Sequence, residues 1–152
     1  MTIASAVCNT FKTEVLRAVH NFTASSGNAF KLALYTSSAN LSKSTTAYAT
    51  NPGGGGDTEI TNTSGSAYSA GGIALTSVTP ALSTDTACCD FADVSFTSAS
   101  FTANGCLIYN DTASGDPAVC SIAFGGDKTV SSGTFTIQFP TADASNAILR
   151  IA

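Results

Sequence analysis

The sequence predicts a mostly β protein: a single antiparallel β-sandwich, jelly-roll or immunoglobulin-like, with one N-terminal α-helix. Three observations support this prediction. Ser and Thr occupy 42 of the 152 positions, and Thr favours the half-buried surface of a strand. In the second half of the chain, short apolar segments alternate with turn residues at regular spacing, as is typical of sandwiches and barrels. A helical period is clear in only one segment.

That segment is residues 10–22, where apolar side chains recur every three or four positions, as on one face of an amphipathic helix. They are Phe11, Val15, Ala18, Val19 and Phe22. Asn9 or Thr10 can cap the start of the helix, and His20 would lie near its end, where the helix dipole favours a proton. We expect residues 1–27 to form an N-terminal arm and this helix.

Residues 30–35 change to a period of two, which places Phe30, Leu32 and Leu34 on one face of a strand. The residues that follow, 36–72, have few large apolar side chains and are rich in Ser, Thr, Asn and Gly. This composition predicts a long loop, and functional surface is often found on such loops.

The remaining strands are expected at intervals of about 8 to 14 residues. They are residues 73–79, 87–96, 98–103, 106–109, 118–124, 134–139 and 147–151. Turns are predicted at residues 110–117, 125–128 and 131–133, where Gly, Asn and Asp provide the positive φ values that reversals need. We expect residues 28–152 to form the sandwich and the whole chain, 1–152, to be a single domain.

The chain carries few charges: 11% of its residues are charged and its net charge is −4. An acidic chain lacks the basic surface that binds phosphates, so no nucleic acid is expected as a partner. No apolar stretch reaches the ~18 residues of a membrane span, so no membrane association is expected. Residues 1–8 have no basic segment before an apolar one, which predicts no signal peptide and a protein made in the cytoplasm.

The cysteines are odd in number and lack C-x-x-C spacing. They are Cys8, Cys88, Cys89, Cys106 and Cys120. In a cytoplasmic protein this pattern predicts reduced thiols that fill the core. A disulfide between Cys106 and Cys120 remains an alternative, because these two residues flank a predicted hairpin.

Catalytic groups are scarce, since the sequence has one His. His20 could activate a cysteine, but a single His beside the apolar face of a helix is more often structural. The acidic pairs Asp57/Glu59 and Asp90/Asp93 could supply the two carboxylates of a glycosidase. Acidic residues also provide most of the solubility of this chain, and sequence spacing alone brings no two carboxylates together. We therefore expect that the protein is not an enzyme.

Residues 110–116 place several oxygen-bearing side chains in one loop, which raises the hypothesis of a calcium site. The spacing is not that of an EF-hand, and Asn and Asp that bond locally within a turn explain the composition better. The glycine run at residues 53–56 is not followed by the Lys-Ser/Thr of a phosphate loop. We expect no metal and no cofactor.

Six segments, in their order along the chain, resemble small structural proteins of tailed bacteriophages. They are 30–39 (FKLALYTSSA), 68–75 (YSAGGIAL), 90–94 (DFADV), 107–111 (LIYND), 124–128 (FGGDK) and 148–151 (ILRI). No single segment is a specific motif, so the similarity rests on their order. The resemblance implies a virion protein assembled in the host cytoplasm, foremost a capsid decoration or cement protein that forms a trimer. Its partners would be the major capsid protein and copies of itself.

Two parts of the chain are candidates for contact with partners: the apolar helix face and the long loop. The candidate interface residues are Phe11, Val15, Val19, Phe22, Tyr48 and Tyr68. The helix face could instead cover the chain's own sandwich. The resemblance leaves a head–tail connector, a tail component or a fibre component as alternatives. A carbohydrate-binding, adhesive sandwich is another alternative, because the loop tyrosines could form an aromatic platform.

Overall fold

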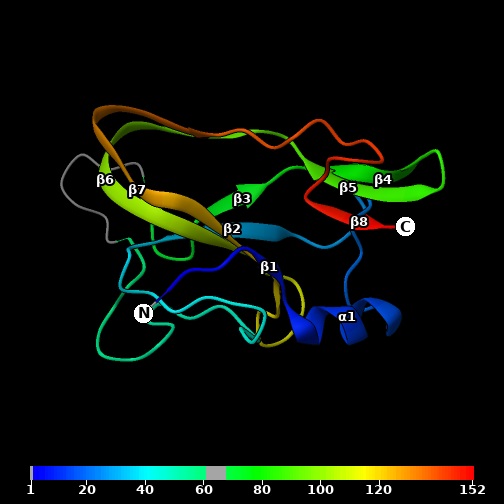
Figure 1. The fold of residues 1–152 in the computed structure, drawn as a ribbon, viewed down its shortest axis with the longest axis horizontal. Helices are drawn as coiled ribbons and strands as arrows, with labels where there is room; N and C mark the ends of the chain where they lie inside the picture. Colours follow the sequence, from blue (N-terminus) through cyan, green and yellow to red (C-terminus); the bar gives the residue numbers. More distant parts are fainter. Residues whose placement is uncertain (1, 61–67) are drawn as a thin grey trace.

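The computed structural model describes residues 2–60 and 68–152. This part of the chain is mostly β, with antiparallel sheets of five and three strands and one short N-terminal helix, so the predicted fold class is confirmed at this level. The elements are β1 (Ala6–Val7), α1 (Asn9–Leu16), β2 (Phe30–Tyr35), β3 (Ile73–Leu75), β4 (Ser77–Ser83), β5 (Thr86–Phe91), β6 (Val94–Asn110), β7 (Ala118–Ile137) and β8 (Leu149–Ile151). The strand orders are β1-β7-β6-β2-β3 and β4-β5-β8. The three-stranded sheet lies at the same end of the molecule as α1 (Figure 1).

Strands β6 and β7 form one long ribbon that bends over the five-stranded sheet. Residues 105–110 of β6 lie within that sheet, paired with β2. Residues 94–103 of β6 run above it toward β4 and β5, still paired with β7 (Figure 1). Pairing of β6 with β2 ends at Gly105, where a Cβ atom would lie 2.6 Å from the carbonyl oxygen of Ile122. Only glycine fits this close approach of the two strands.

The turn predicted at residues 125–128 lies inside β7 and does not reverse the chain. Gly125 and Gly126 have φ values of 74° and 136°, as the turn prediction requires. However, β7 pairs with β6 on both sides of them, so the extra residues leave the ladder as a bulge at the bend. The predicted strands 118–124 and 134–139 therefore belong largely to one strand.

Two further bulges lie on opposite strands of the ribbon, so the inward-facing residues of β6 stay paired with inward-facing residues of β7. On β6 the inward-facing residues Phe96 and Ala99 are three positions apart instead of two. On β7 the paired positions Gly133 and Val130 are also three apart. The turn predicted at residues 131–133 is this second bulge, so the chain continues where a reversal was expected. Each strand has one extra residue, and the alternation of inward and outward side chains resumes beyond them.

Other predicted strand boundaries were also wrong. The strands predicted at 73–79 and 87–96 are each broken, the first at Thr76, because the chain crosses there from the five-stranded to the three-stranded sheet. The strands predicted at 98–103 and 106–109 are instead continuous in β6. Breaks and continuations of this kind depend on which sheet a segment joins, which local sequence does not specify.

The helix predicted over residues 10–22 ends at Leu16. Ala18 has a φ of 58°, and the N–H of Val19 donates to the carbonyl oxygen of Glu14 at 3.0 Å. This is a Schellman motif, in which the left-handed position is usually Gly. Because Ala occupies that position here, the sequence shows no stop signal, and the apolar period continues past the end of the helix.

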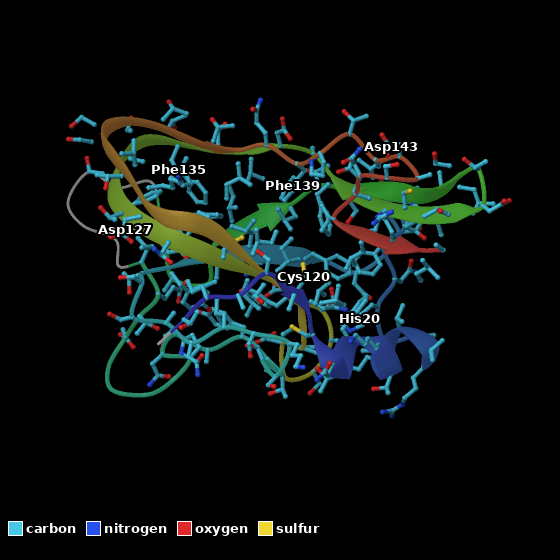
Figure 2. All side chains as sticks on the ribbon, viewed as in Figure 1. His20, Cys120, Asp127, Phe135, Phe139 and Asp143 are labelled. Atoms are coloured by element: carbon cyan, nitrogen blue, oxygen red, sulfur yellow. The ribbon has the colours of Figure 1, made fainter. Side chains whose placement is uncertain are left out.

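The core between the ribbon and the five-stranded sheet is largely aromatic. The ring centroids of Phe101 and Phe135 are 5.1 Å apart, and those of Phe96 and Phe101 are 5.8 Å apart. Figure 2 shows Phe135 on the side of the upper ribbon that faces the sheet. Closer to α1, the rings of Phe22 and Phe30 stack with centroids 4.4 Å apart.

The predicted loop 36–72 carries no strand over its described residues. It lies against the five-stranded sheet through backbone hydrogen bonds. The N–H of Ile60 donates to the carbonyl oxygen of Leu34 at 2.9 Å, and the N–H of Ala118 donates to that of Thr46 at 3.0 Å. The described part of the loop is therefore held to the sheet on two of its strands.

Candidate functional site

An apolar groove of about 480 Å³ lies between α1 and the three-stranded sheet. Its volume is in the range of sites that bind ligands or peptide side chains. On the helix side the lining includes Val7, Phe11, Val15, Leu16 and Phe22. On the sheet side it includes Pro80, Ala87, Cys89, Leu149 and Ile151.

The floor of the groove is the inner face of the three-stranded sheet, which extends beyond the core. Leu82 pairs with Ala87, and Ala87 pairs with Ile151, so these side chains form one row on the same face. The next row on that face, Cys89 and Leu149, is buried. Leu82 is 73% exposed and Ile151 is 65% exposed. The outermost row of the sheet is therefore left uncovered by the described part of the chain.

The helix contributes a third exposed apolar side chain to this end of the molecule. Leu16, the last residue of α1, lines the groove and is 87% exposed. Burial of an exposed Leu or Ile side chain contributes about 1.5–3 kcal/mol. Apolar residues that are exposed together mark binding surfaces more often than isolated ones do. The groove and its exposed rim are thus the best candidate for a functional surface.

Lys12 and Arg150 are the charged residues in the lining. Arg150 pairs with Cys88, so its side chain lies on the opposite face of the sheet from Ala87 and Leu149. Lys12 Nζ donates to Asn9 Oδ1 at 3.2 Å, and Arg150 Nη1 donates to the carbonyl oxygen of Ala144 at 2.6 Å. Both partners are neutral. The pKa of Asp143 is lowered, mainly by backbone N–H groups that bond to its carboxylate and least by Arg150. Lys12 therefore offers a positive charge at the rim of the groove to an approaching group.

The structure brings three of the six predicted interface residues to the groove: Phe11, Val15 and Phe22. Phe11 and Phe22 are buried in the core, so they form the bottom of the groove and not a free helix face. The helix thus covers the chain's own β structure, which is the alternative given for its apolar face. Val19 follows the helix and is not part of the lining.

The other two predicted residues, Tyr48 and Tyr68, meet at a buried carboxylate. Tyr48 Oη donates to Glu59 Oε2 at 2.7 Å, whereas Tyr68 Oη donates to Glu59 Oε1. The N–H of Gly71 also donates to Oε1, at 2.7 Å. Tyr48 stacks on Tyr109 with ring centroids 4.6 Å apart, and Tyr68 is buried. These tyrosines anchor the loop internally, and the buried Tyr68 is not presented at the surface of this structure.

The phenol groups of Tyr35, Tyr48 and Tyr68, which surround Glu59, stay protonated. Burial raises the pKa of Tyr35, Tyr48 and Tyr68 well above the usual value, and the nearby Glu59 raises each of them further. Tyr68 Oη also accepts a hydrogen bond from the N–H of Leu34 at 3.0 Å. Tyr48 and Tyr68 therefore keep donating to Glu59 over the physiological pH range, and the N–H of Leu34 ties Tyr68 to β2.

His20 is held by a carboxylate and an amide, not by a cysteine. Its Nε2 is 2.9 Å from Glu14 Oε2, and its Nδ1 is 3.1 Å from Asn110 Nδ2. Asn110 Oδ1 accepts from two backbone N–H groups of the turn that follows, so its NH₂ group faces the ring. Nδ1 is then the acceptor and Nε2 the donor toward Glu14. Figure 2 shows His20 beside α1. The same bonds confirm the local turn predicted for residues 110–116.

The carboxylates of each acidic pair differ in their exposure or in the backbone group that they bond. Asp57 is exposed whereas Glu59 is buried. Asp90 Oδ1 accepts the next backbone N–H at 2.8 Å, and Asp93 Oδ1 accepts the N–H of Phe139 at 2.8 Å. Within residues 2–60 and 68–152, no group of three or more His, Cys, Asp or Glu could hold a metal ion. No helix in those residues is long and apolar enough to cross a membrane.

All five cysteines are free and buried, which confirms their predicted place in the core. Cys106 and Cys120 lie on the paired strands β6 and β7, as expected of residues that flank a hairpin. The register pairs Cys106 with Ile122 and Cys120 with Ile108, so the two thiols are not directly opposite each other. Burial raises the pKa of the Cys106 thiol to about 12.

Stability is expected to fall as the pH rises from about 8 to about 10. Cys106 ionises near pH 9.0 in the unfolded chain but only near 12 when buried. Above pH 9 the unfolded state alone loses this proton, which lowers the free energy of unfolding by about 1 kcal/mol per such thiol at pH 10. Urea unfolding at both pH values measures the loss, and Cys106→Ala should reduce it. An equal loss in the variant would contradict the assignment to this thiol.

Comparison with family models, with curated proteins and with solved structures gives no match for the chain. Its function therefore has to be inferred from the groove and the residues around it.

Three residues of this surface were not found from the sequence: Leu16, Leu82 and Ile151. Leu16 carries a signal in retrospect, because it is a large apolar residue outside the apolar face of the helix. Leu82 and Ile151 carry none, because an apolar residue in a strand looks the same in sequence whether its sheet face is covered or not.

Proposed function

We propose that the chain is a non-enzymatic structural protein of a tailed-phage virion that binds neighbouring subunits as a capsid decoration protein. The observation that carries the proposal is the uncovered apolar row of the three-stranded sheet beside the groove. A surface of this kind is suited to protein contacts, because its apolar side chains gain from burial and its few polar groups can be placed at the rim. The resemblance of six segments to phage structural proteins supports the virion setting. A jelly-roll or immunoglobulin-like sandwich is the finer fold that we propose.

The proposed mechanism is additive contact over many copies. Each copy would bury the groove against a neighbouring subunit, and the shell would be stabilised by the sum of modest contacts. The outer face of the β6–β7 ribbon fits an exposed position on a particle, because its Ser and Thr hydroxyl groups can be hydrated. Ser95 and Thr136 pair across the strands at 2.9 Å, as do Thr102 and Thr129 at 2.8 Å.

The adhesive alternative has less support from the tyrosines than the sequence suggested. A sugar platform needs an exposed aromatic face. Tyr68 is buried, and Tyr48 stacks on Tyr109 while it donates to Glu59. Neither ring is thus presented as a free platform.

Purified particles test the proposal. Quantitative mass spectrometry should find on the order of hundreds of copies per particle, as contact by many weak bonds requires. About a dozen copies or fewer would point to the symmetric ring of a connector or a fibre instead. Absence from the particles would remove the proposal altogether.

A matched pair of variants connects incorporation to the groove. Ile151→Lys places a charge in the uncovered row, whereas Val78→Lys places the same charge on the opposite face of the sheet, beside Asp90. Val78 is 46% exposed, so both variants should fold. When each competes with the unmodified protein during assembly, Ile151→Lys should be depleted from particles and Val78→Lys should not. Equal incorporation of both would exclude the groove as the docking surface.

A further inference from the structure

We propose that a second copy of the chain fills the groove, with each copy inserting its β4–β5 hairpin into the groove of the other about a twofold axis. This inference rests on the proposed function, because it takes the groove as a protein-binding surface and names one protein that binds there. The partner is identified from the shape, the apolar residues and the charges at one end of the molecule.

The apolar fit comes from the hairpin itself. Leu82 lies near the tip of the hairpin and is directly opposite Ala87, which lines the groove. The end of the sheet thus presents an exposed apolar side chain, and the space beside it is bounded by Leu16 and Ile151. When two such ends interleave, Leu82 of each copy can enter the other's groove, and all three exposed side chains are buried together.

The charges of the two parts are complementary. Asp85 lies in the turn between Ser83 and Thr86 and is exposed. The groove that receives the hairpin carries the cation Lys12 and no carboxylate in its lining, whereas Arg150 pairs with Cys88 and its side chain lies on the other face of the sheet. The chain has a net charge of −4, so two copies repel each other on average and need local pairing of opposite charges to associate in one orientation. Asp85 of each copy against Lys12 of the other provides that pairing.

A twofold axis follows from the position of these parts. The hairpin and the groove are built on the same small sheet, at the same end of the molecule (Figure 1). A surface that carries both a projection and its receiving groove is self-complementary, which is the condition for an isologous interface. The expected species in solution is therefore a dimer, and not the trimer that the phage resemblance implies.

The mass of the full chain in solution is the first test. One copy has a mass of 15.2 kDa. Sedimentation equilibrium should find twice this mass, with dissociation on dilution. A single-copy mass at every concentration would overturn the inference, as would a three-copy mass.

Exposed apolar residues give the second test. Leu16→Lys, Leu82→Lys and Ile151→Lys should each weaken self-association by about 30-fold or more, as expected when a central contact is lost. Val78→Lys, on the other face of the sheet, should leave it unchanged. Leu16 is 87% exposed, so its substitution tests the contact without a cost to folding. The inference fails if Val78→Lys weakens association as much as the other three do.

A charge exchange gives the third test. Asp85→Lys alone and Lys12→Asp alone should each weaken association, because each places like charges across the interface. The Asp85→Lys/Lys12→Asp double variant should recover most of it, since the exchanged charges attract each other across the interface again. No recovery would exclude this pairing. A single-copy mass of the unmodified chain together with normal copy number in particles would overturn this inference alone, whereas absence from particles would overturn the proposed function.

Discussion

Replacing Glu59 by Leu should lower the free energy of unfolding by about 4 kcal/mol. The carboxylate is buried and accepts from Tyr48, Tyr68 and the N–H of Gly71. Leucine has a similar size but no acceptor, so three donors lose their partner in a place with little access to water. An unsatisfied buried donor costs about 1–3 kcal/mol, and part of this is offset because a charged group is no longer buried.

Chemical denaturation followed by circular dichroism measures the effect. Asp57→Leu is the matched control, because it removes an exposed carboxylate from the same loop, two positions away from Glu59. It should change stability by less than about 0.5 kcal/mol. Tyr48→Phe removes a single donor and should cost about 1–2 kcal/mol. If Glu59→Leu were no more harmful than Asp57→Leu, the carboxylate would not be what holds the loop.

Gly72→Ala should also destabilise the protein strongly, by about 4 kcal/mol or more. Gly72 has a φ of 83°, and a Cβ atom there would overlap the carbonyl oxygen of Leu32 and lie 2.5 Å from its carbonyl carbon. Leu32 is in β2, which is paired on both edges, with β3 and β6. The backbone of an inner strand has little freedom to move away, so the added methyl group displaces β3 or the loop before it.

A second glycine separates the clash from the backbone conformation. Gly54 has a φ of 74° but no atom within 4 Å of the position of its Cβ. Gly54→Ala therefore carries only the cost of an L-residue in a left-handed conformation, about 1–2 kcal/mol. Thermal unfolding of the two variants should show a much larger decrease in Tm for Gly72→Ala. Similar decreases would mean that the conformation, and not the contact with Leu32, limits this site.

Much of the fold could be predicted from local pattern because burial and periodicity agree there. The alternation of Phe30, Leu32 and Leu34 predicted a strand, and β2 has the bounds Phe30–Tyr35. The start of the helix follows from its apolar period, but its end does not, because Ala18 takes a conformation that usually requires Gly. The glycines at 125 and 126 indicated positive φ correctly but not the direction of the chain, which the pairing with β6 decides.

The candidate site was less predictable than the fold. The sequence identified Phe11, Val15 and Phe22 as one apolar face, and the structure places all three at the groove. It did not indicate that Leu82 and Ile151 are uncovered, because exposure of a sheet face depends on how far the sheet extends past the core. Sequence proximity paired Glu59 with Asp57, whereas the hydrogen-bond partners of Glu59 are tyrosines that the fold brings to it.

The two adjacent bulges of the outer ribbon limit how this protein can change over evolutionary time. Ala99 and Gly133 form the one pair between them, with Ser98 at φ 53° and Ser132 at φ 48° as the extra residues. A deletion in either strand alone would shift one strand by a single residue and turn its hydroxyl side chains toward the aromatic core. Insertions and deletions in this ribbon should therefore be accepted only in compensating pairs, one on each strand. Length variation among descendants of this chain is accordingly expected in its loops and not here.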